Sequence, residues 1–341
     1  MAERVITERE LNRALLARQL LLQRARLPVP RALERMGGIQ NQYAPNAYIR
    51  LWSCLEGFRR GDLTRALERR TVVQGTLMRS TIHTVSAREY WLYATGMRRA
   101  MREWTLKVRR GSERELRRRD DRLRAALRDG PRSVKELGDL AKGFVGLWGE
   151  LVRVPPSGTW DRRRADLLAT ADHWLGSCQV SEEEGLEHLI RRYLGGFGPA
   201  SLKHVSSWAG VPPKHLEPAA ARLRLRRFRD EHGGELLDLP RAPLPPAGTP
   251  APVRFLPTWD AILLVHARRT GVMPEDYRPV VFSTKNPPSV PTFLVDGRVA
   301  GAWRYEAGRV ELEPYERLSR AAERELRAEG KRLAAFMADG G

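Results

Sequence analysis

Two glutamines separated by one residue, Gln40 and Gln42, lie in the stretch GGIQNQYAP at residues 37–45. Each side-chain amide offers a carbonyl acceptor and an NH2 donor, so two amides brought together can hold and orient one water molecule. On a regular helix, residues two apart point away from each other, so the pair converges only where a helix ends. Gly37 and Gly38, which adopt positive φ readily, are suited to ending a helix here. A Gln-x-Gln stretch is common, however, and a solvated loop is the plain alternative.

The overall charge points to a polyanionic partner. Among 341 residues, 60 Lys and Arg face 41 Asp and Glu, which gives a net charge of +19 and a pI near 10.8. Such a field favours nucleic acid, whose phosphates release condensed counterions when protein cations bind. Only Cys54 and Cys178 are present, so the sequence predicts no disulfide framework, metal centre or cofactor. A membrane-spanning apolar run and a signal peptide are both lacking, and the expected location is cytoplasmic.

A repeat suggests the architecture. GPRSVKEL at residues 130–137 and GPASLKHV at residues 198–205 match as Gly-Pro-x-Ser-apolar-Lys-x-apolar, 68 positions apart. In each copy a helical pattern precedes the Gly-Pro, and Ser133 or Ser201 is placed to N-cap the next helix. An apolar-basic run broken by turn residues follows in both copies. A helix, a turn, a helix and a two-stranded ribbon form the outline of a winged helix-turn-helix.

A weaker third copy lies upstream. Residues 7–28 predict a long helix with Thr7 as its N-cap and Glu10 as the capping-box partner. Residues 29–38 take the place of the Gly-Pro-x-Ser helix, and TLMRSTIHTV at residues 76–85 alternates as a β-ribbon does. We therefore expect three winged-helix units, the first of which carries the glutamines: residues 1–110, 111–180 and 181–240.

The final region, residues 241–341, has a different character. A proline-rich linker at residues 240–252 precedes short apolar runs, and VDGR at residues 295–298 predicts a hairpin turn. These features favour a small β-barrel or curled sheet closed by a terminal helix at residues 317–338. The fold class predicted for the whole chain is mainly α with β (α+β).

Five blocks in this order resemble the AlkZ-like winged-helix DNA glycosylases, with similarity extending from about residue 15 to residue 304: MGGIQNQYAPNAYIRLW, GTLMRSTIHTV, YLGGFGPASLKHVSSWAGV, FLPTWD and PTFLVDGRVAGAWR. The resemblance implies a monomeric, C-shaped protein of three winged-helix units and a β-barrel, whose basic concave face binds double-stranded DNA. It also implies excision of N7-alkylated purines, including bulky natural-product adducts and, in some members, interstrand crosslinks. A setting of self-resistance to a DNA-alkylating antibiotic follows from the same resemblance.

The catalytic motif of the family is glutamine, an apolar residue, and then glutamine or aspartate, so the resemblance assigns the catalytic positions to Gln40 and Gln42. Asn41 departs from this pattern because it is polar, which puts the local packing in doubt more than the chemistry. N7-alkylguanine already carries a positive charge and leaves readily, so the enzyme mainly has to place a water against the anomeric carbon. Without a carboxylate in the motif, activity should be confined to cationic lesions. Because no lysine lies nearby, β-lyase activity is not expected.

Several further residues are candidates for contacting DNA or the lesion. Arg79 and His83 fall in the first ribbon beside the glutamines, although a buried structural histidine is about equally plausible for His83. The stretch VHARRTGVMP at residues 265–274 resembles the turn of a β-hairpin that the family places near the minor groove. His266, Arg268 and Arg269 would then read groove width or phosphates, with a solvated turn as the alternative.

Other conspicuous residues favour structural roles. Trp259 and Asp260 predict a strand-end packing and turn pair, with Asp260 the carboxylate to test if the glutamines fail. The charged run at residues 109–122 predicts a solvated helix or a phosphate clamp. Trp52, Trp174 and Trp208 lie on apolar helix faces and are expected in the core. Two rival functions remain open: a non-catalytic winged-helix regulator, which normally dimerises to read two half-sites, and a protein that shields adducts without cleaving them.

Overall fold

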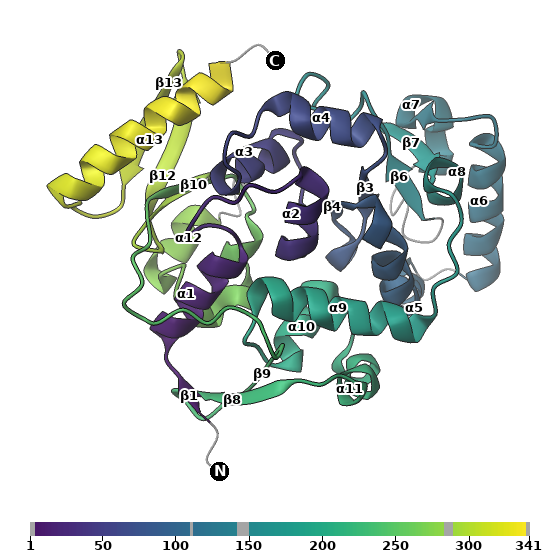
Figure 1. The fold of residues 1–341 in the computed structure, drawn as a ribbon. Helices are drawn as coiled ribbons and strands as arrows, with labels where there is room; N and C mark the ends of the chain where they lie inside the picture. Colours follow the sequence, from purple (N-terminus) through teal and green to yellow (C-terminus); the bar gives the residue numbers. More distant parts are fainter. Residues whose placement is uncertain (1–3, 110–111, 142–149, 283–288, 339–341) are drawn as a thin grey trace.

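The computed structural model describes residues 4–109, 112–141, 150–282 and 289–338. Its first region combines five helices with short strands (Figure 1). In chain order these elements are β1 (Val5–Ile6), α1 (Glu8–Arg18), α2 (Val29–Met36), β2 (Ile39–Gln40), α3 (Pro45–Cys54), α4 (Arg60–Glu68), β3 (Val72–Thr76), β4 (Ile82–Ser86) and α5 (Tyr90–Arg109). The mixed helix-and-strand class expected from the sequence is confirmed.

Helix starts follow the capping signals in the sequence. The Thr7 side chain accepts a hydrogen bond from the Glu10 backbone N–H, and the Glu10 carboxylate accepts one from the Thr7 backbone N–H, which completes the expected capping box. Ser133 caps α7 (Val134–Leu137) in the same way. Ser201 occupies the N-cap of α10 (Leu202–Ala209), where its hydroxyl meets the His204 ring at 2.9 Å. Both copies of the Gly-Pro-x-Ser repeat therefore lead into a helix.

One six-stranded sheet joins the first two predicted units. Its order is β2-β4-β3-β6-β7-β5, where β5 is Arg132–Ser133, β6 is Leu151–Arg153 and β7 is Leu167–Thr170. The ribbon predicted at residues 76–85 is part of the β3–β4 hairpin. Antiparallel pairing of Gly75 with Val152 carries the sheet from the first unit into the second. The helices α6 (Glu113–Ala126) and α8 (Ala171–Leu175) complete this part.

The third predicted unit contains α9 (Glu182–Phe197), α10, α11 (Pro213–Arg222) and the ribbon of β8 (Arg226–Asp230) and β9 (Glu235–Asp238). The first strand of the chain, β1, pairs in parallel with β8 through Val5 and Arg229, so the N-terminal segment adds to this ribbon. Helix α9 packs along α5 so closely that Gly96 and Gly185 meet backbone to backbone, where any Cβ would clash.

The C-terminal region is built on an antiparallel sheet in the order β10-β11-β12-β13. These strands span Arg254–Leu256, Thr292–Val295, Arg298–Glu306 and Arg309–Pro314, and the terminal helix α13 (Arg320–Ala338) packs against β13. The predicted VDGR hairpin turn joins β11 to β12, with Gly297 at a φ of 80°. Closure of this sheet into a barrel stays a prediction.

The β-hairpin predicted at residues 265–274 is wrong. The segment forms a 3-10 helix, Val265–Thr270, between two shorter 3-10 turns at Ala261–Leu263 and Glu275–Tyr277. Its buried residues do not alternate as a strand requires, because His266 and Ala267 are adjacent and Thr270 follows three positions later. Burial of one side of a helical turn therefore decided the local structure.

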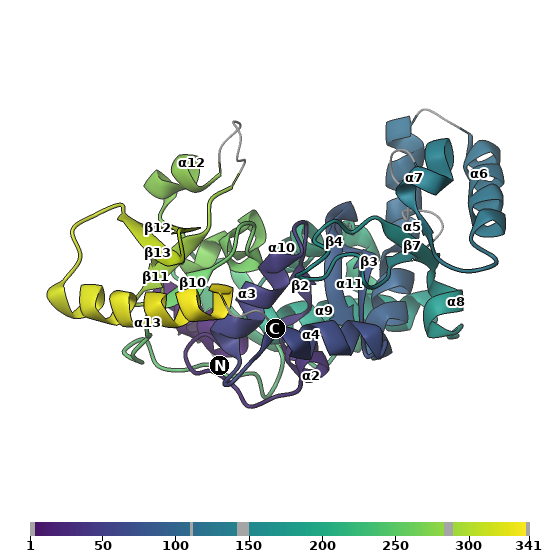
Figure 2. The same ribbon diagram turned by 90° about the horizontal axis from the view of Figure 1, so that it is seen from above.

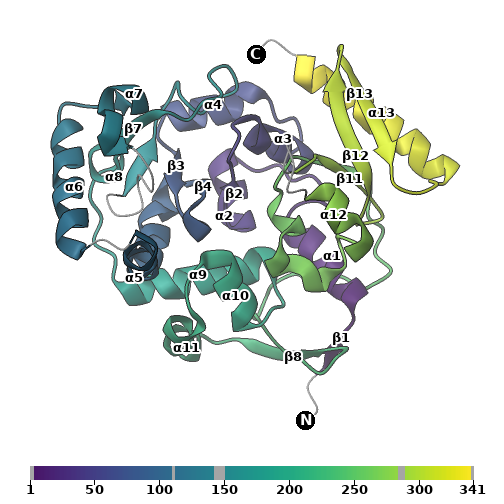
Figure 3. The same cartoon turned by 180° about the vertical axis from the view of Figure 1, so that it is seen from behind.

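Two arms rise from the same side of the molecule. Seen from above, α12 (Arg278–Val281) lies in one arm, and α6 and α7 lie in the other (Figure 2). From behind, β2, β4 and α10 occupy the space between them (Figure 3). Strand β2, which carries Gln40, therefore lies between the two arms.

A buried ion pair holds the first and third regions together. The Arg18 guanidinium at the end of α1 donates to both carboxylate oxygens of Asp238 in β9, at 2.7 and 3.0 Å, and neither side chain is exposed. Further bonds run to the carbonyl oxygens of Leu194 and Pro243. One guanidinium thus ties together α1, α9, β9 and the proline-rich linker.

Replacing Asp238 with alanine should cost about 3–5 kcal/mol of unfolding free energy, because Arg18 would remain buried without its counter-charge. Urea unfolding of the purified variant measures this loss. The control is Glu56→Ala, which removes the carboxylate of the exposed pair Arg26–Glu56 and should cost at most about 1 kcal/mol. Equal losses in the two variants would contradict a special role for the buried pair.

Candidate active site

Two glycines convert the end of α2 into the start of the glutamine strand. Gly37 and Gly38 have φ values of 81° and 79°, and both backbone N–H groups donate to the carbonyl oxygen of Leu33. The helix end predicted at the glycines is confirmed. A Cβ on Gly38 would lie 2.8 Å from a Val85 methyl group, so the turn also needs glycine for space.

The glutamines are aligned by a strand rather than by the helix end itself. Ile39 and Gln40 pair with Thr84 and His83 of β4, and the Asn41 N–H continues the ladder to the Ile82 carbonyl at 2.7 Å. Alternate side chains of an extended chain point to the same face. Gln40 therefore lies on the face of the strand opposite to Ile39 and Asn41, and Gln42, in the bend that follows, is held near β4 by its own side chain.

Each glutamine accepts a hydrogen bond that sets the orientation of its amide. Gln40 is buried, and its Oε1 accepts from Nη2 of Arg79. Gln42 is exposed, and its Oε1 accepts from the backbone N–H of Ile82 at 2.8 Å. Because each partner is a donor, the carbonyl oxygen must face it and the NH2 group must point elsewhere. Each oxygen keeps a second lone pair for a further donor such as water.

Asn41 points to the opposite face of the strand from Gln40. Its side chain is buried, and its Nδ2 donates to the hydroxyl of Thr84 at 3.1 Å. Its Oδ1 has no hydrogen-bond partner among the described residues. A polar residue is accommodated in the position where the family motif has an apolar one because a hydroxyl faces it across the ladder.

His83 is a neutral, buried histidine beside Gln40. Its Nδ1 lies 3.1 Å from the Thr81 carbonyl oxygen, so this nitrogen carries the proton and leaves Nε2 as an acceptor. Burial, followed by the nearby Arg79 cation, lowers the pKa of His83 to about 3. The imidazole is therefore uncharged at neutral pH, and its role toward DNA or the lesion stays a prediction.

The three DNA-contact candidates in the segment Val265–Thr270 differ in burial and in bonding partners. His266 is buried, burial lowers its pKa well below the ordinary value, and neither ring nitrogen has a partner in the described part of the chain. Arg269 donates to the carbonyl oxygens of His266, Phe197 and Pro199, so it fastens this turn to the end of α9.

Arg268 differs from Arg269 in being at the surface. It forms an exposed pair with both carboxylate oxygens of Glu275. An exposed pair is worth little, so this cation can exchange its carboxylate for a phosphate at small cost. As contacts to DNA, all three residues from this segment stay predictions.

The residues expected to be structural occupy packed positions. Asp260 is buried against Arg50, whose Nε lies 2.8 Å from its carboxylate, and it accepts a hydrogen bond from the Ile262 N–H. Trp208 is fully buried, whereas Trp52 and Trp174 are only partly buried against the cores. Residues 113–122 of the charged run lie in α6 with exposed pairs such as Arg117–Glu113, while residues 110–111 lie outside the described ranges.

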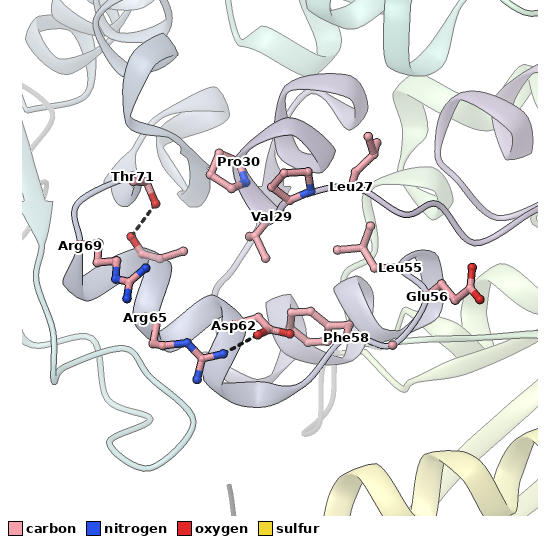
Figure 4. Close-up of a pocket in the computed structure, with 13 residues that line it drawn as sticks. Leu27, Val29, Pro30, Leu55, Glu56, Phe58, Asp62, Arg65, Arg69 and Thr71 are labelled. Carbon is pink, nitrogen blue, oxygen red and sulfur yellow. Dashed lines mark hydrogen bonds and ion pairs between the residues drawn. The ribbon is translucent and has the colours of Figure 1, made fainter.

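A pocket of about 420 Å³ lies between α2 and α4 (Figure 4). Its wall combines apolar side chains, among them Val29 and Phe58, with the ion pair Arg65–Asp62. None of the candidate catalytic or DNA-contacting residues lines it, so it is separate from the glutamine site. Within the described ranges, no cluster of His, Cys, Asp and Glu has the arrangement of a metal site, and no helix is long and apolar enough to cross a membrane.

Several groups at the site escaped the sequence analysis: the backbone N–H of Ile82, the carbonyl oxygens of Thr81 and Trp208, and the Thr84 hydroxyl. The first three are backbone groups, and residue types do not reveal which backbone groups meet a site. Thr84 had one usable signal, because its place in the alternating stretch IHTV puts it on the face opposite His83.

A comparison with solved structures finds a protein of the same fold. The chain superposes on the DNA glycosylase AlkZ of Streptomyces sahachiroi with a TM-score of 0.78 over 97% of each chain, at 17% sequence identity. At this identity the likeness shows a shared fold. Among curated proteins, none matches the chain significantly.

The family follows from a second comparison. The family model "DNA glycosylase AlkZ-like" matches residues 33–336, which include the glutamine strand, the six-stranded sheet and the C-terminal sheet. The chain therefore belongs to the AlkZ-like DNA glycosylase family. It is a DNA repair glycosylase whose substrate is DNA.

Gly38→Ala should destabilise the protein and displace the glutamine strand, because the new Cβ meets Val85 and the φ is unfavourable for alanine. We expect a loss of about 2 kcal/mol or more in urea unfolding, against about 1 kcal/mol for Gly57→Ala. Gly57 has a similar φ of 67° but open space around it, so it isolates the backbone contribution. If both variants lose the same amount, crowding at Val85 is irrelevant.

Two buried histidines should make the protein acid-labile. Burial lowers the pKa of both His83 and His188 to about 3, whereas both are near 6.5 when unfolded. Between these values the unfolded chain binds more protons, so stability is full above pH 6.5 and falls as the pH drops toward 3. Each residue contributes about 1.4 kcal/mol per pH unit within this window.

Unfolding free energies at pH 7.5 and pH 5.5 measure this dependence. The double variant His83→Gln/His188→Gln should lose about half of it, because burial also lowers the pKa values of His204 and His266, which remain. His173→Gln, at an exposed position, should keep all of it. An undiminished pH dependence in the double variant would assign the acid lability to other groups.

Proposed function

We propose that this glycosylase hydrolyses the N-glycosidic bond of bulky, cationic N7-alkylguanine adducts, with Gln40 and Gln42 orienting the attacking water. One observation carries the proposal: both glutamines follow closely after a glycine-ended helix, and the side-chain carbonyl oxygen of each is oriented by a donor. Two carbonyl oxygens held in this way can accept the two protons of one water and direct its lone pair toward the sugar.

The chemistry suits a site without an acid. As the bond between the anomeric carbon and N9 breaks, its electron pair neutralises the positive charge of the alkylated ring, so no proton has to be delivered to the base. The water oxygen forms the new bond to the anomeric carbon, and the proton that it loses passes to solvent water, since an amide oxygen is too weak a base to keep it. Placing this water correctly is worth several kcal/mol of the barrier.

The substrate range follows from what the site lacks. The motif contains no carboxylate, and Asp260 is occupied by Arg50. Neutral leaving groups such as uracil or an undamaged purine would need protonation, so we propose that they are poor substrates. No lysine adjoins the motif in the sequence to form a covalent imine, so base release should occur without strand cleavage.

Binding to duplex DNA is proposed to occur between the two arms (Figure 2). The net charge of +19 supplies the non-specific attraction to phosphates.

We further propose that residues 1–110, 111–180 and 181–240 act as winged-helix units and residues 241–341 as the fourth domain, in a monomer. Arg268 is the candidate of the 265–270 segment that is most accessible to the phosphate backbone. Self-resistance to a DNA-alkylating natural product and unhooking of interstrand crosslinks belong to the same proposal.

Gln40→Ala and Gln42→Ala should each lower the rate of base release by about 10²-fold, because the water loses one of its two anchors. The assay measures free modified base from duplexes carrying 7-methylguanine or a bulky guanine-N7 adduct. Binding to the same duplexes should stay within a few fold of wild type. The matched control is Gln23→Ala, which removes an exposed glutamine outside the motif.

If wild type and both glutamine variants release the modified base at the same rate, other groups position the water. Asp260→Asn would then be the next variant to test. If wild type binds DNA tightly and releases no cationic N7 adduct, the proposed substrate class is wrong. Sequence-specific binding in that case would favour a regulator, and preferential binding to the adduct would favour a shielding protein.

A further inference from the structure

Arg79 has an unusual backbone conformation at the tip of the β3–β4 hairpin. Its φ and ψ are 53° and 28°, and Ser80 follows with a φ of 60°, so two residues with a Cβ occupy the left-handed region in succession. Such conformations are costly and persist where the surrounding structure imposes them. The chain keeps an arginine at a position where glycine would relieve the backbone, which indicates that its side chain is needed.

The end of helix α10 packs closely against the backbone of Arg79. Helix α10 ends at Gly210, and a Cβ on this glycine would lie 3.3 Å from both the Cα and the N of Arg79. The carbonyl of Trp208, two residues earlier, accepts a hydrogen bond from Nη1 of Arg79. The hairpin tip is therefore clamped against the end of α10.

The Arg79 guanidinium is partly buried without a counter-charge. The buried arginines Arg18 and Arg50 each face a carboxylate, Asp238 and Asp260 respectively. Among the described residues, the acceptors of Arg79 are only the neutral oxygens of Gln40 and Trp208. Burial lowers its pKa to about 10, which still leaves it charged at neutral pH. A charged donor forms strong hydrogen bonds, so Arg79 fixes the orientation of the neutral oxygens to which it donates.

We propose that Arg79 is a positioning residue, which acts on base excision through Gln40 by fixing the orientation of its amide. This inference rests on the proposed function of Gln40. A glutamine side chain rotates about three bonds, and its amide can present either oxygen or nitrogen. With Nη2 of Arg79 as a fixed donor, Gln40 must turn its oxygen toward the guanidinium, where the remaining lone pair is available to water.

The same contact connects three parts of the fold at the catalytic amide. Arg79 stands on the hairpin tip, Gln40 on β2, and the Trp208 carbonyl on α10. Hydrogen bonds in such a chain polarise one another, so the charged donor also makes the Gln40 NH2 group a stronger donor. The third predicted unit, which lacks the glutamines, thereby helps to set their geometry.

A direct contact from Arg79 to a DNA phosphate is the competing role. The two can be separated because a phosphate contact acts on binding and its salt dependence, whereas positioning acts on the rate within the bound complex. Arg79→Lys keeps the charge but loses the planar fork that reaches two acceptors. Arg79→Gly removes the side chain and suits the left-handed backbone, so the variant should fold.

The experiment compares wild type, Arg79→Lys, Arg79→Gly and the control Arg88→Met, which removes an exposed cation from the same region. For each, single-turnover release of 7-methylguanine is measured at saturating enzyme, together with duplex affinity at several salt concentrations and thermal stability. We expect both Arg79 variants to lose about 10–100-fold in the saturated rate. Their affinity and salt slope should match those of Arg88→Met, and their melting temperatures should match that of wild type.

A double-mutant cycle then tests whether Arg79 acts through Gln40. In the Gln40→Ala background, Arg79→Gly should cause no further loss of rate. Additive losses would overturn the inference, as would a wild-type saturated rate in the Arg79 variants. A salt slope reduced by about one with the rate unchanged would make Arg79 a phosphate contact instead. If Gln40→Ala itself retains the wild-type rate, the proposed function fails first, and this inference fails with it.

Discussion

The short ladder between β2 and β4 is the constraint on which the rest of the site depends. Two residue pairs, Ile39 with Thr84 and Gln40 with His83, convert a helix end into a strand that places Gln40 beside His83, and Gln42 in the following bend accepts from the backbone N–H of Ile82 in β4. The turn works because Gly37 and Gly38 accept left-handed backbone and leave space for β4. Without this ladder, the glutamines would lie on a helix end whose side chains diverge.

The basic side chains around that ladder are either uncharged or bonded to neutral oxygens, and the described residues place no carboxylate against them. His83 and His266 are uncharged because they are buried, and among the described residues Arg79 donates only to neutral oxygens. The carboxylate at Asp260 is tied to Arg50. A site of this kind cannot act as a strong acid, but it can hold a water and leave a cationic base to depart on its own. The electrostatics of the site and the proposed substrate class therefore agree.

The predicted units are not independent bodies in the structure. Strands of the first and second units form one six-stranded sheet, β1 joins the ribbon of the third, and Arg18 ties the first helix to Asp238. Sharing sheets and buried ion pairs in this way restricts hinge motion between the units.

The choice of Gln40 and Gln42 came from the resemblance to the family. Local signals in the sequence determined the capping box of Thr7 and Glu10, the glycine end of α2, the β3–β4 and VDGR hairpins and the terminal helix. Each of these depends on residues within a few positions of one another, so residue type and spacing suffice. Only the tertiary structure decided the acceptors of Arg79, which lie 39 and 129 positions away, and the shared sheet. The same is true of the 3-10 helix at Val265–Thr270, where burial against α9 and α10 overrode a local turn signal. Strand register and buried contacts over such separations depend on how whole elements pack, and no local pattern encodes that.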